Sequence, residues 1–109
     1  MVMGVYTTKP VRKLSPEEFK YLHQGKQIEV ADHAFFHLST KQRKIFNEED
    51  LINIIKRETP RKIYLQENGR FGAYYRKSDG YRKIIIEVHD KMIVLVSFMD
   101  VTELPRYGL

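Results

Sequence analysis

The sequence contains no cysteine and no tryptophan. The lack of cysteine excludes disulfide frameworks and thiolate metal sites. Its hydrophobic runs are short, because none approaches the roughly 18 residues that identify a membrane-spanning helix, and no signal-peptide pattern is present. We therefore expect a cytoplasmic protein with no membrane partner.

The chain also lacks internal repeats, low-complexity tracts and linkers. Hydrophobic residues make up 42% of its 109 residues, which is enough for a core that needs neither disulfides nor a metal. We expect a single domain over residues 1–109, with no cofactor.

Acidic residues are the minority among the charged ones. The chain has 19 Lys and Arg against 14 Asp and Glu, a net charge of +5 and an isoelectric point of about 9.5. This balance favours polyanionic partners, because basic side chains neutralise phosphates. A charge-rich surface on a heat-adapted protein would have the same composition.

Four β-rich runs separated by turn signals occupy residues 61–99. Asn68-Gly69 is a strong hairpin signal, and Asp79-Gly80 and His89-Asp90 mark two further tight turns. The runs between them are residues 62–66, 71–76, 81–88 and 92–98. This pattern predicts a four-stranded antiparallel meander.

Residues 14–60 carry the helix signals. Ser15 begins a first helix with a capping box and Gly25 ends it, a second helix is predicted from Asp32, and Asn47 caps a third. His23 ends the first helix, where the helix dipole favours an imidazolium. The prediction is an α+β fold with two or three N-terminal helices packed on one face of the meander. Residues 1–13 are then a loose arm or an edge strand, residues 26–30 fit a short strand, and residues 100–109 form an irregular tail.

The second predicted helix carries a polar face of chemical interest. His33 and His37 lie four residues apart on it, with Arg43 and Lys44 close by. Imidazole titrates near neutral pH and an arginine can stabilise phosphorane charge, so this face suits general acid–base cleavage of a phosphodiester. No spacing supplies a third metal ligand, so no metal site is predicted. A solvated helix face explains these residues equally well.

One end of the meander interleaves tyrosines with basic residues. Tyr75 and Arg76 lie on one strand and Arg82 and Lys83 on the next, a composition that suits stacking on unpaired bases beside phosphate contacts. Ordinary strand composition is the alternative. If His89-Asp90 is a two-residue turn, the register places Arg82 opposite Ser97, whereas a one-residue bulge would exchange the faces. The same counting puts Tyr75 beside Ile84 and Arg76 beside Lys83.

A resemblance follows from four of these features: His33 at the start of a helix, Arg43 ten residues later, Asn47 at the start of the next helix, and Ser97 ending an apolar strand. Over residues 32–100 the chain resembles small phage- and plasmid-borne domains of unknown function that are related to RelE-like and colicin-like ribonuclease toxins. The resemblance implies a barnase- and RelE-like sheet whose concave side binds RNA. It also implies metal-independent attack by the 2′-hydroxyl, with His33, Arg43 and Ser97 in the catalytic positions.

These features predict a toxin-like endoribonuclease, in which His33 or His37 is the general base or acid and Arg43, Arg76 and Arg82 bind phosphate. Its partners would be RNA and an antitoxin-like protein. Two alternatives remain open from the sequence: a non-catalytic nucleic-acid-binding module that uses the basic end of the sheet, and a protein-interaction domain.

Overall fold

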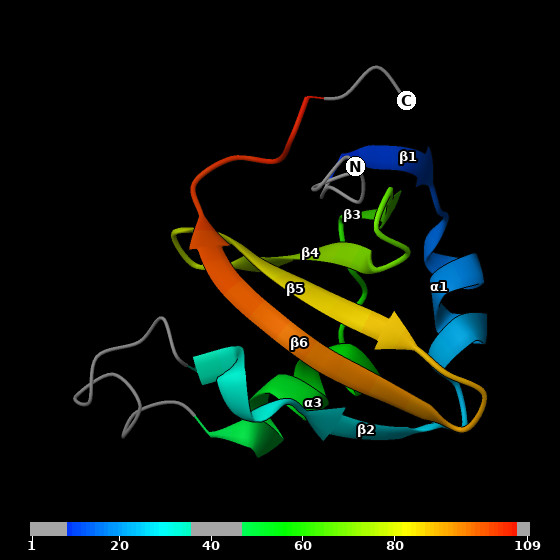
Figure 1. Cartoon of the computed structure of the whole chain (residues 1–109). Coiled ribbons are helices and arrows are strands. Elements are labelled where there is room, and N and C mark those ends of the chain that lie inside the picture. The colour runs from blue at the N-terminus through cyan, green and yellow to red at the C-terminus, as the bar shows by residue number, and fades with distance from the viewer. Residues whose placement is uncertain (1–8, 36–46, 107–109) are drawn as a thin grey trace, which may run out of the picture.

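The computed structural model describes residues 9–35 and 47–106. In this part of the chain, six strands form one mixed sheet and two short helices pack on it (Figure 1). The strands are β1 (Pro10–Lys13), β2 (Gln27–Val30), β3 (Lys62–Gln66), β4 (Phe71–Lys77), β5 (Gly80–Val88) and β6 (Met92–Val101). The helices are α1 (Pro16–His23) and α3 (Glu48–Arg57), and the 3-10 helix η1 (Asp32–Phe35) follows β2. Neither described helix has the length and apolar character needed to cross a membrane.

The strand order across the sheet is β1-β3-β4-β5-β6-β2. Neighbouring strands are antiparallel, except that β2 and β6 are parallel. Strands β3 to β6 lie where the sequence placed its meander. The predicted fold is nevertheless wrong, because the sheet has six strands, is mixed, and carries only two short helices in the described residues.

The pairing of the two edge strands accounts for most of this error: a short strand was expected at residues 26–30 and an edge strand was one reading of residues 1–13, but neither was placed in the sheet. Each has only four residues and pairs with a strand far along the chain, so that Pro10 lies beside Gln66 and Ile28 beside Ile93. Such nonlocal pairing leaves little trace in a local hydrophobic pattern. The helix predicted from Asp32 is a 3-10 turn as far as Phe35, and residues 36–46 lie outside the described residues.

Local signals place the helix starts correctly. The Ser15 hydroxyl accepts a hydrogen bond from the Glu18 amide at 3.1 Å, and the Glu18 carboxylate accepts one from the Ser15 amide at 3.0 Å. The Asn47 side chain accepts a hydrogen bond from the Asp50 amide at 2.9 Å. These caps satisfy amide donors that the first turn of a helix leaves without partners, so they fix where α1 and α3 begin.

Glycine is required at the first position of β5, directly after the turn that joins it to β4. Gly80 has a φ of +144°, and a Cβ atom there would lie 2.5 Å from the carbonyl oxygen of Val101. A larger residue would therefore be strained in its backbone and would also clash with the chain at the end of β6.

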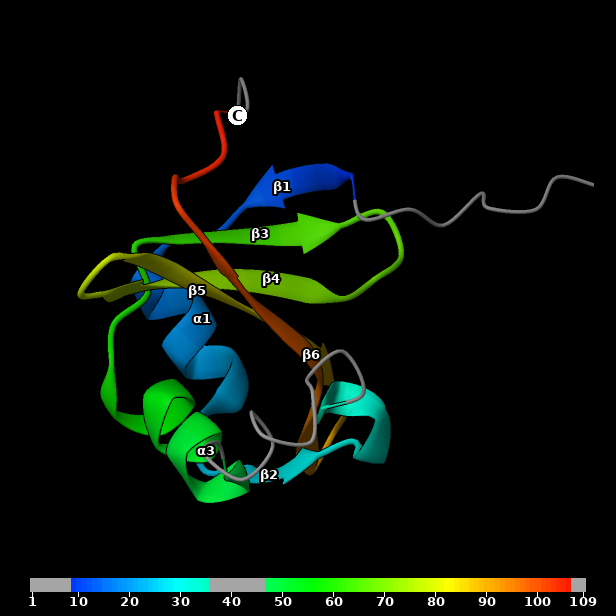
Figure 2. The ribbon, with the colours of Figure 1, turned by 90° about the vertical axis from the view of Figure 1, so that its left-hand side faces the viewer.

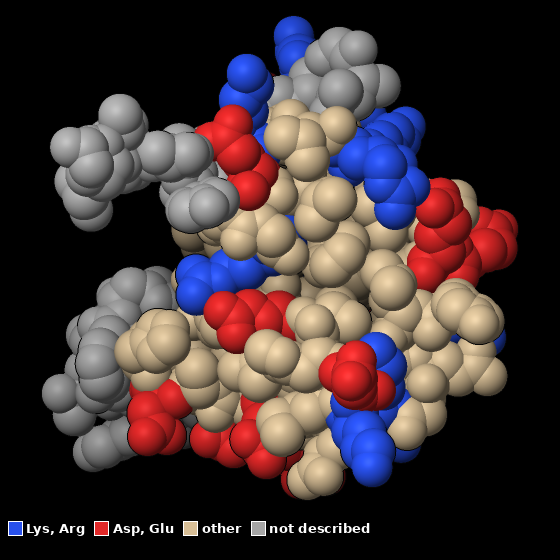
Figure 3. Space-filling view, turned by 45° about the vertical axis from the view of Figure 1, so that its right-hand side comes forward, with Lys and Arg blue, Asp and Glu red and all other residues tan. Residues whose placement is uncertain are grey.

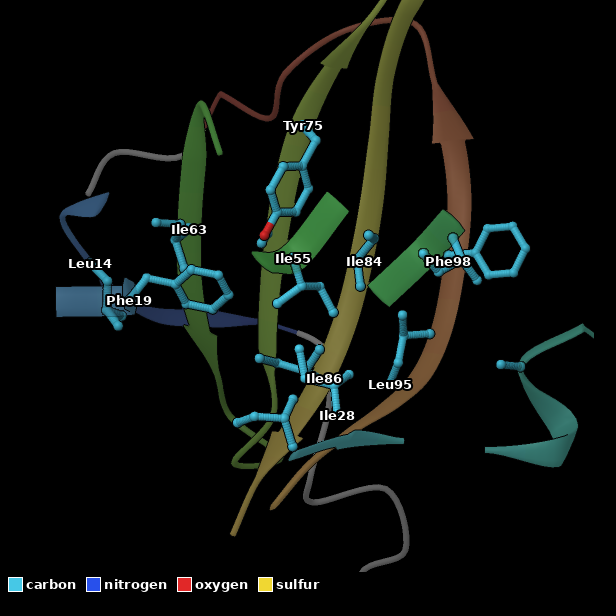
Figure 4. Packing of buried hydrophobic residues seen from close by; sticks show 14 residues of the cluster. Leu14, Phe19, Ile28, Ile55, Ile63, Tyr75, Ile84, Ile86, Leu95 and Phe98 are labelled. Carbon is cyan, nitrogen blue, oxygen red and sulfur yellow. The ribbon is translucent and has the colours of Figure 1, made fainter. Parts of the chain in front are cut away.

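Helices α1 and α3 lie on the same side of the strongly twisted sheet (Figure 2). We call that side the helix face and the other side the open face. The side chains of the helix face form one hydrophobic core, seen from close by in Figure 4. Its most buried large members are Phe19, Leu51, Ile55, Ile63, Tyr75, Ile84, Ile86, Ile93 and Leu95. Burying one such side chain contributes roughly 1.5–3 kcal/mol, so this face supplies much of the stability.

The register of β5 against β6 differs from the predicted one. Arg82 lies beside Asp100, and Ser97 lies beside Ile85 rather than beside Arg82. The β5–β6 loop is longer than two residues, and a β-bulge leaves Val96 without a cross-strand partner. Because one extra residue exchanges the two faces of a strand, Ser97 lies on the open face while Arg82 lies on the helix face.

The register of β4 against β5 is also shifted, by two residues. Tyr75 lies beside Arg82 instead of Ile84, and Arg76 lies beside Tyr81 instead of Lys83. The two turn residues are Ser78 and Asp79, not Asp79 and Gly80. A shift of two residues preserves the faces, so Tyr75 stays on the side of the core.

Candidate functional site

The open face presents aromatic and basic side chains at alternate positions of neighbouring strands. The register places Tyr74 of β4 beside Lys83 of β5, and Arg76 beside Tyr81. Tyr64 of β3 lies on the same face and contacts Tyr74. We call this group the open-face patch, and it consists of Tyr64, Tyr74, Arg76, Tyr81 and Lys83.

Two tyrosines form the floor of the patch. The rings of Tyr64 and Tyr74 meet edge to face, with centroids 6.4 Å apart and an interplanar angle of 82°. Their side chains are 3% and 5% exposed, although neither described helix covers them. Both rings are therefore buried, and the accessible groups of the patch are those above and beside them.

Lys83 lies above this floor. Its Nζ atom is 5.5 Å from the centroid of the Tyr74 ring, and partial burial lowers the pKa of its amine. Gly72 makes this packing possible, because a Cβ there would lie 3.1 Å from Gln66 Nε2 and 3.3 Å from Lys83 Cε. Gln66 is buried beside them, and its side-chain oxygen has no hydrogen-bond partner among the described residues.

Arg76 and Tyr81 form the accessible part of the patch. The guanidinium carbon of Arg76 lies 5.3 Å from the Tyr81 ring centroid, and its Nη1 donates to the carbonyl oxygen of Gly80 at 3.2 Å. In the described part of the chain, neither Arg76 nor Lys83 has a carboxylate as an ion-pair partner. The remaining guanidinium donors can therefore bind an external anion.

Two of the predicted nucleic-acid-binding residues lie on the helix face instead. Tyr75 is 1% exposed within the core, so its ring is unavailable for base stacking. Arg82 is held by Asp100, with Nε 2.8 Å from Oδ1, and Lys77 contacts the same carboxylate at 3.2 Å. The hydrogen bond from Arg82 is the main cause that lowers the pKa of Asp100, so this cation is neutralised locally.

Two members of the predicted catalytic set, His33 and Ser97, lie in the described residues. His33 is exposed in η1, whose Phe35 packs edge to face on Phe98 at 5.5 Å between centroids. Phe98 belongs to the helix face, so its neighbour Ser97 points to the open face. His37, Arg43 and Lys44 lie outside the described residues. Within residues 9–35 and 47–106, no three His, Asp or Glu side chains gather to hold a metal ion.

A cavity of about 280 Å³ separates α1 from the end of α3, where residues 55–60 line it. His23 borders it, half-buried, with its ring 5.1 Å from that of Phe19. Burial lowers the pKa of His23, which is opposite in direction to the effect of the helix dipole considered from the sequence.

A second cavity, of about 390 Å³, lies at one end of the open face. Lys62, Tyr81 and residues 102–106 line it. Lys62 lies beside Tyr74 in the register of β3 and β4, so the cavity continues directly from the open-face patch. Sequence reasoning missed Lys62, Tyr64 and Gln66, although polar residues at every second position of β3 are a signal for an open sheet face.

Basic and acidic side chains are interspersed on the face shown in Figure 3, around a largely uncharged area. The net charge of +5 therefore does not gather into one continuous basic field on this face. On this face, anion recognition has to come from local arrangements of cations.

No family model, curated protein or solved structure matches this chain. The resemblance to RelE-like and colicin-like toxins therefore rests on the sequence motifs alone.

Proposed function

We propose that this protein binds single-stranded nucleic acid, with RNA as the expected class, across the open-face patch. The observation that carries the proposal is the placement of Arg76 and Lys83. Both cations lie against tyrosine rings on a face that neither described helix covers, and neither has an ion-pair partner in the described residues.

This arrangement suits unpaired bases better than a duplex. Unstacked bases bind to aromatic rings and to the planes of arginine side chains, while neighbouring cations contact the phosphates. Tyr81 and the guanidinium of Arg76 offer such planes, and Lys83 offers a positive charge beside them. A stacked base contributes about 1–3 kcal/mol in proteins that bind single strands, which is enough for useful affinity from a small patch.

Of the functions expected from the sequence, we favour binding over cleavage. The described residues bring together groups that hold a strand, whereas Ser97 lies on the open face of β6 and His33 lies exposed in η1, which contacts β6 through Phe35 and Phe98. Endoribonuclease activity therefore has no geometric support in the part of the chain that the structure describes, and it remains a prediction from the sequence.

Fluorescence anisotropy with a labelled single-stranded RNA of roughly ten nucleotides tests the binding proposal. Affinity should fall as salt rises, and the double variant Arg76→Ala, Lys83→Ala should bind about tenfold more weakly, with a salt slope shallower by about 1.4 for two lost phosphate contacts. Thermal melts verify that the variant is folded.

The matched control is Lys20→Ala, Arg57→Ala, which removes the same two charges from α1 and α3. An equal loss of affinity in this control would show that only net charge matters and would reject the patch. Affinity that does not change with salt would reject nucleic acid and favour the protein-interaction alternative. A denaturing gel of the same mixtures in EDTA, with His33→Ala alongside, tests the endoribonuclease prediction separately.

A further inference from the structure

The second cavity, of about 390 Å³, is a shallow hollow that is mostly open to solvent. It shares Tyr81 with the open-face patch, and residues 102–106 line much of the rest of it. Lys62 also joins the two regions, because it lines the hollow and lies beside Tyr74 in the register of β3 and β4. The hollow and the patch therefore form one continuous surface, along which an extended ligand can lie.

Cations gather where the hollow meets the patch. Lys62 begins β3 and Arg76 lies near the end of β4, so antiparallel pairing brings them to the same end of the sheet, and Arg106 joins them from the chain after β6. At the other end of the open face, Arg70 is bound by Glu87, with Nη2 2.8 Å from Oε2. Among the described residues, no carboxylate forms such a pair with Lys62, Arg76 or Arg106. These three cations can therefore bind an external anion.

The lining of the hollow combines charge with apolar surface. Lys62 and Arg106 are its basic residues and Glu103 is its acidic one, so basic groups outnumber acidic ones. Leu104 and Pro105 are half-buried and supply apolar surface. Cations contact the phosphates of a single strand, while its bases pack on flat or apolar side chains. The lining therefore suits a further nucleotide of a bound strand.

The open-face patch alone is small for a strand. It offers one accessible ring, that of Tyr81, and two cations, Arg76 and Lys83. Single-strand-binding domains of another fold contact roughly 4–16 nucleotides each, through a groove that follows the backbone. A strand held by the patch would therefore extend beyond it, and the hollow is the adjoining surface that carries cations.

We propose that the hollow is a second nucleotide subsite, across which a continuous single strand passes from the open-face patch. Lys62 and Arg106 contact a phosphate of this strand, and the adjoining base packs on Leu104 and Pro105 beside Tyr81. The inference rests on the proposed single-strand binding and adds the path that the strand takes. Because the hollow is open, it accepts internal nucleotides and requires no strand end.

Fluorescence anisotropy with labelled oligouridylates of about 3 to 16 nucleotides tests the second subsite. The affinity of the wild type should rise with length until the strand spans both subsites. The affinity of the double variant Lys62→Ala, Arg106→Ala should stop rising at a shorter length, because the strand gains nothing by reaching the hollow. With the longest strand, this variant should bind about tenfold more weakly, with a salt slope shallower by about 1.4 for two lost phosphate contacts.

Three further variants separate local contacts from net charge. Lys56→Ala, Arg57→Ala removes two charges from α3 and should lower affinity by less than about twofold, because salt screens distant charges. Arg106→Ala changes one exposed residue and should make the salt slope shallower by about 0.7, which keeps the test valid if the substitution of Lys62 unfolds the protein. Glu103→Gln should strengthen binding of the longest strand, because it removes a negative charge from the hollow.

A circular RNA tests whether the strand is continuous. An oligouridylate circle of about 40 nucleotides should bind within about twofold of the linear RNA of the same length, because internal nucleotides supply every contact. Binding of the circle that is weaker by about tenfold or more would overturn the passage of a continuous strand and would show that an end is required.

The remaining outcomes separate the second subsite from the proposed function. If the double variant at Lys62 and Arg106 loses no affinity, or loses the same fraction at every length, the second subsite is overturned and single-strand binding by the patch stands. An equal loss in the α3 control, or no gain in Glu103→Gln, would also overturn the phosphate contact in the hollow. If the wild type binds no RNA of any length, the proposed function and the second subsite are both rejected.

Discussion

The two faces of the sheet bury adjacent tyrosines in different ways. Tyr75 lies in the core, where Figure 4 shows its hydroxyl pointing toward Ile55, and that hydroxyl has no hydrogen-bond partner among the described residues. Tyr74, the preceding residue, lies on the open face beneath Lys83. The alternation of a strand thus places one tyrosine in the core and its neighbour beneath the cation of the open-face patch.

The same contrast holds for arginines. Arg82 is neutralised by Asp100, which also contacts Lys77, whereas Arg76 lies on an aromatic ring. Both side chains belong to the same hairpin. The number of basic residues therefore indicates less about function than does the identity of the group that contacts each of them.

The largest expected effect comes from truncating the core side of β6. Leu95 has 0% exposure on the helix face, so Leu95→Ala should lower the free energy of unfolding by about 2–5 kcal/mol through lost transfer energy and a cavity. Met99, on the same strand but 41% exposed on the open face, is the matched control, and Met99→Ala should cost less than about 1 kcal/mol. Urea denaturation measures both. Equal losses would contradict the division into a core face and an open face.

A smaller effect, of opposite sign, is expected at the buried tyrosine. Tyr75→Phe should raise the free energy of unfolding by about 1 kcal/mol, because it removes a buried hydroxyl that has no partner among the described residues. Tyr81→Phe, on the open face, should leave stability unchanged. Destabilisation by Tyr75→Phe would show that the hydroxyl is satisfied in the folded protein.

The wild type and the Tyr75→Phe variant should also differ in how their stability depends on pH in the alkaline range. Burial, with a smaller effect from the charge of Glu58, raises the pKa of Tyr75 far above its ordinary value of 10.0. The folded state thus favours the neutral phenol, so stability is complete below pH 10 and declines above it as unfolded chains ionise. Urea melts of the wild type should show this decline, and the difference between wild type and Tyr75→Phe isolates it from the lysines.

The smallest effect concerns the exposed ion pair. Arg82→Ala should cost less than about 1 kcal/mol at pH 7, because Asp100 is partly solvated, and Arg76→Ala should cost still less.

The hydrogen bond from Arg82 lowers the pKa of Asp100 below 3.8, so the contribution of the pair is present above that pH and is lost as the pH falls further. Melts of the Arg82→Ala variant and wild type should therefore converge in acid. A constant difference would assign the loss to packing against Phe98.

The sequence predicted what is decided locally. The caps at Ser15 and Asn47 and the turn at Gly69 depend on neighbouring residues, and the structure has them where they were expected. Strand β1 pairs with β3 and strand β2 pairs with β6, each more than fifty residues away in the sequence. No local pattern predicts such pairing. The strand order therefore could not be predicted from local sequence patterns.

The candidate site followed the same rule. The basic and aromatic composition near Arg76 and Lys83 was visible in the sequence, but the face of each residue depended on turn lengths and on the bulge at Val96. Successive side chains of a strand lie on opposite faces, so an error of one residue in the register of β6 placed Ser97 on the helix face instead of the open face. The resemblance to ribonuclease toxins could not correct this, because one of its three motif residues, Arg43, falls outside the described residues.

The parallel pairing of β2 with β6 has a consequence for how the chain acquires its structure. Gln27 of β2 pairs with Met92 of β6, which is synthesised 65 residues later. Strand β2 therefore cannot join the edge of the sheet until β6 has been synthesised. Contacts of such high sequence separation slow folding, because a long loop must close before they form. A nascent chain interrupted before β6 would leave Ile28 without Ile93 and would expose the flank of β5, making it a substrate for chaperones rather than a partly working protein.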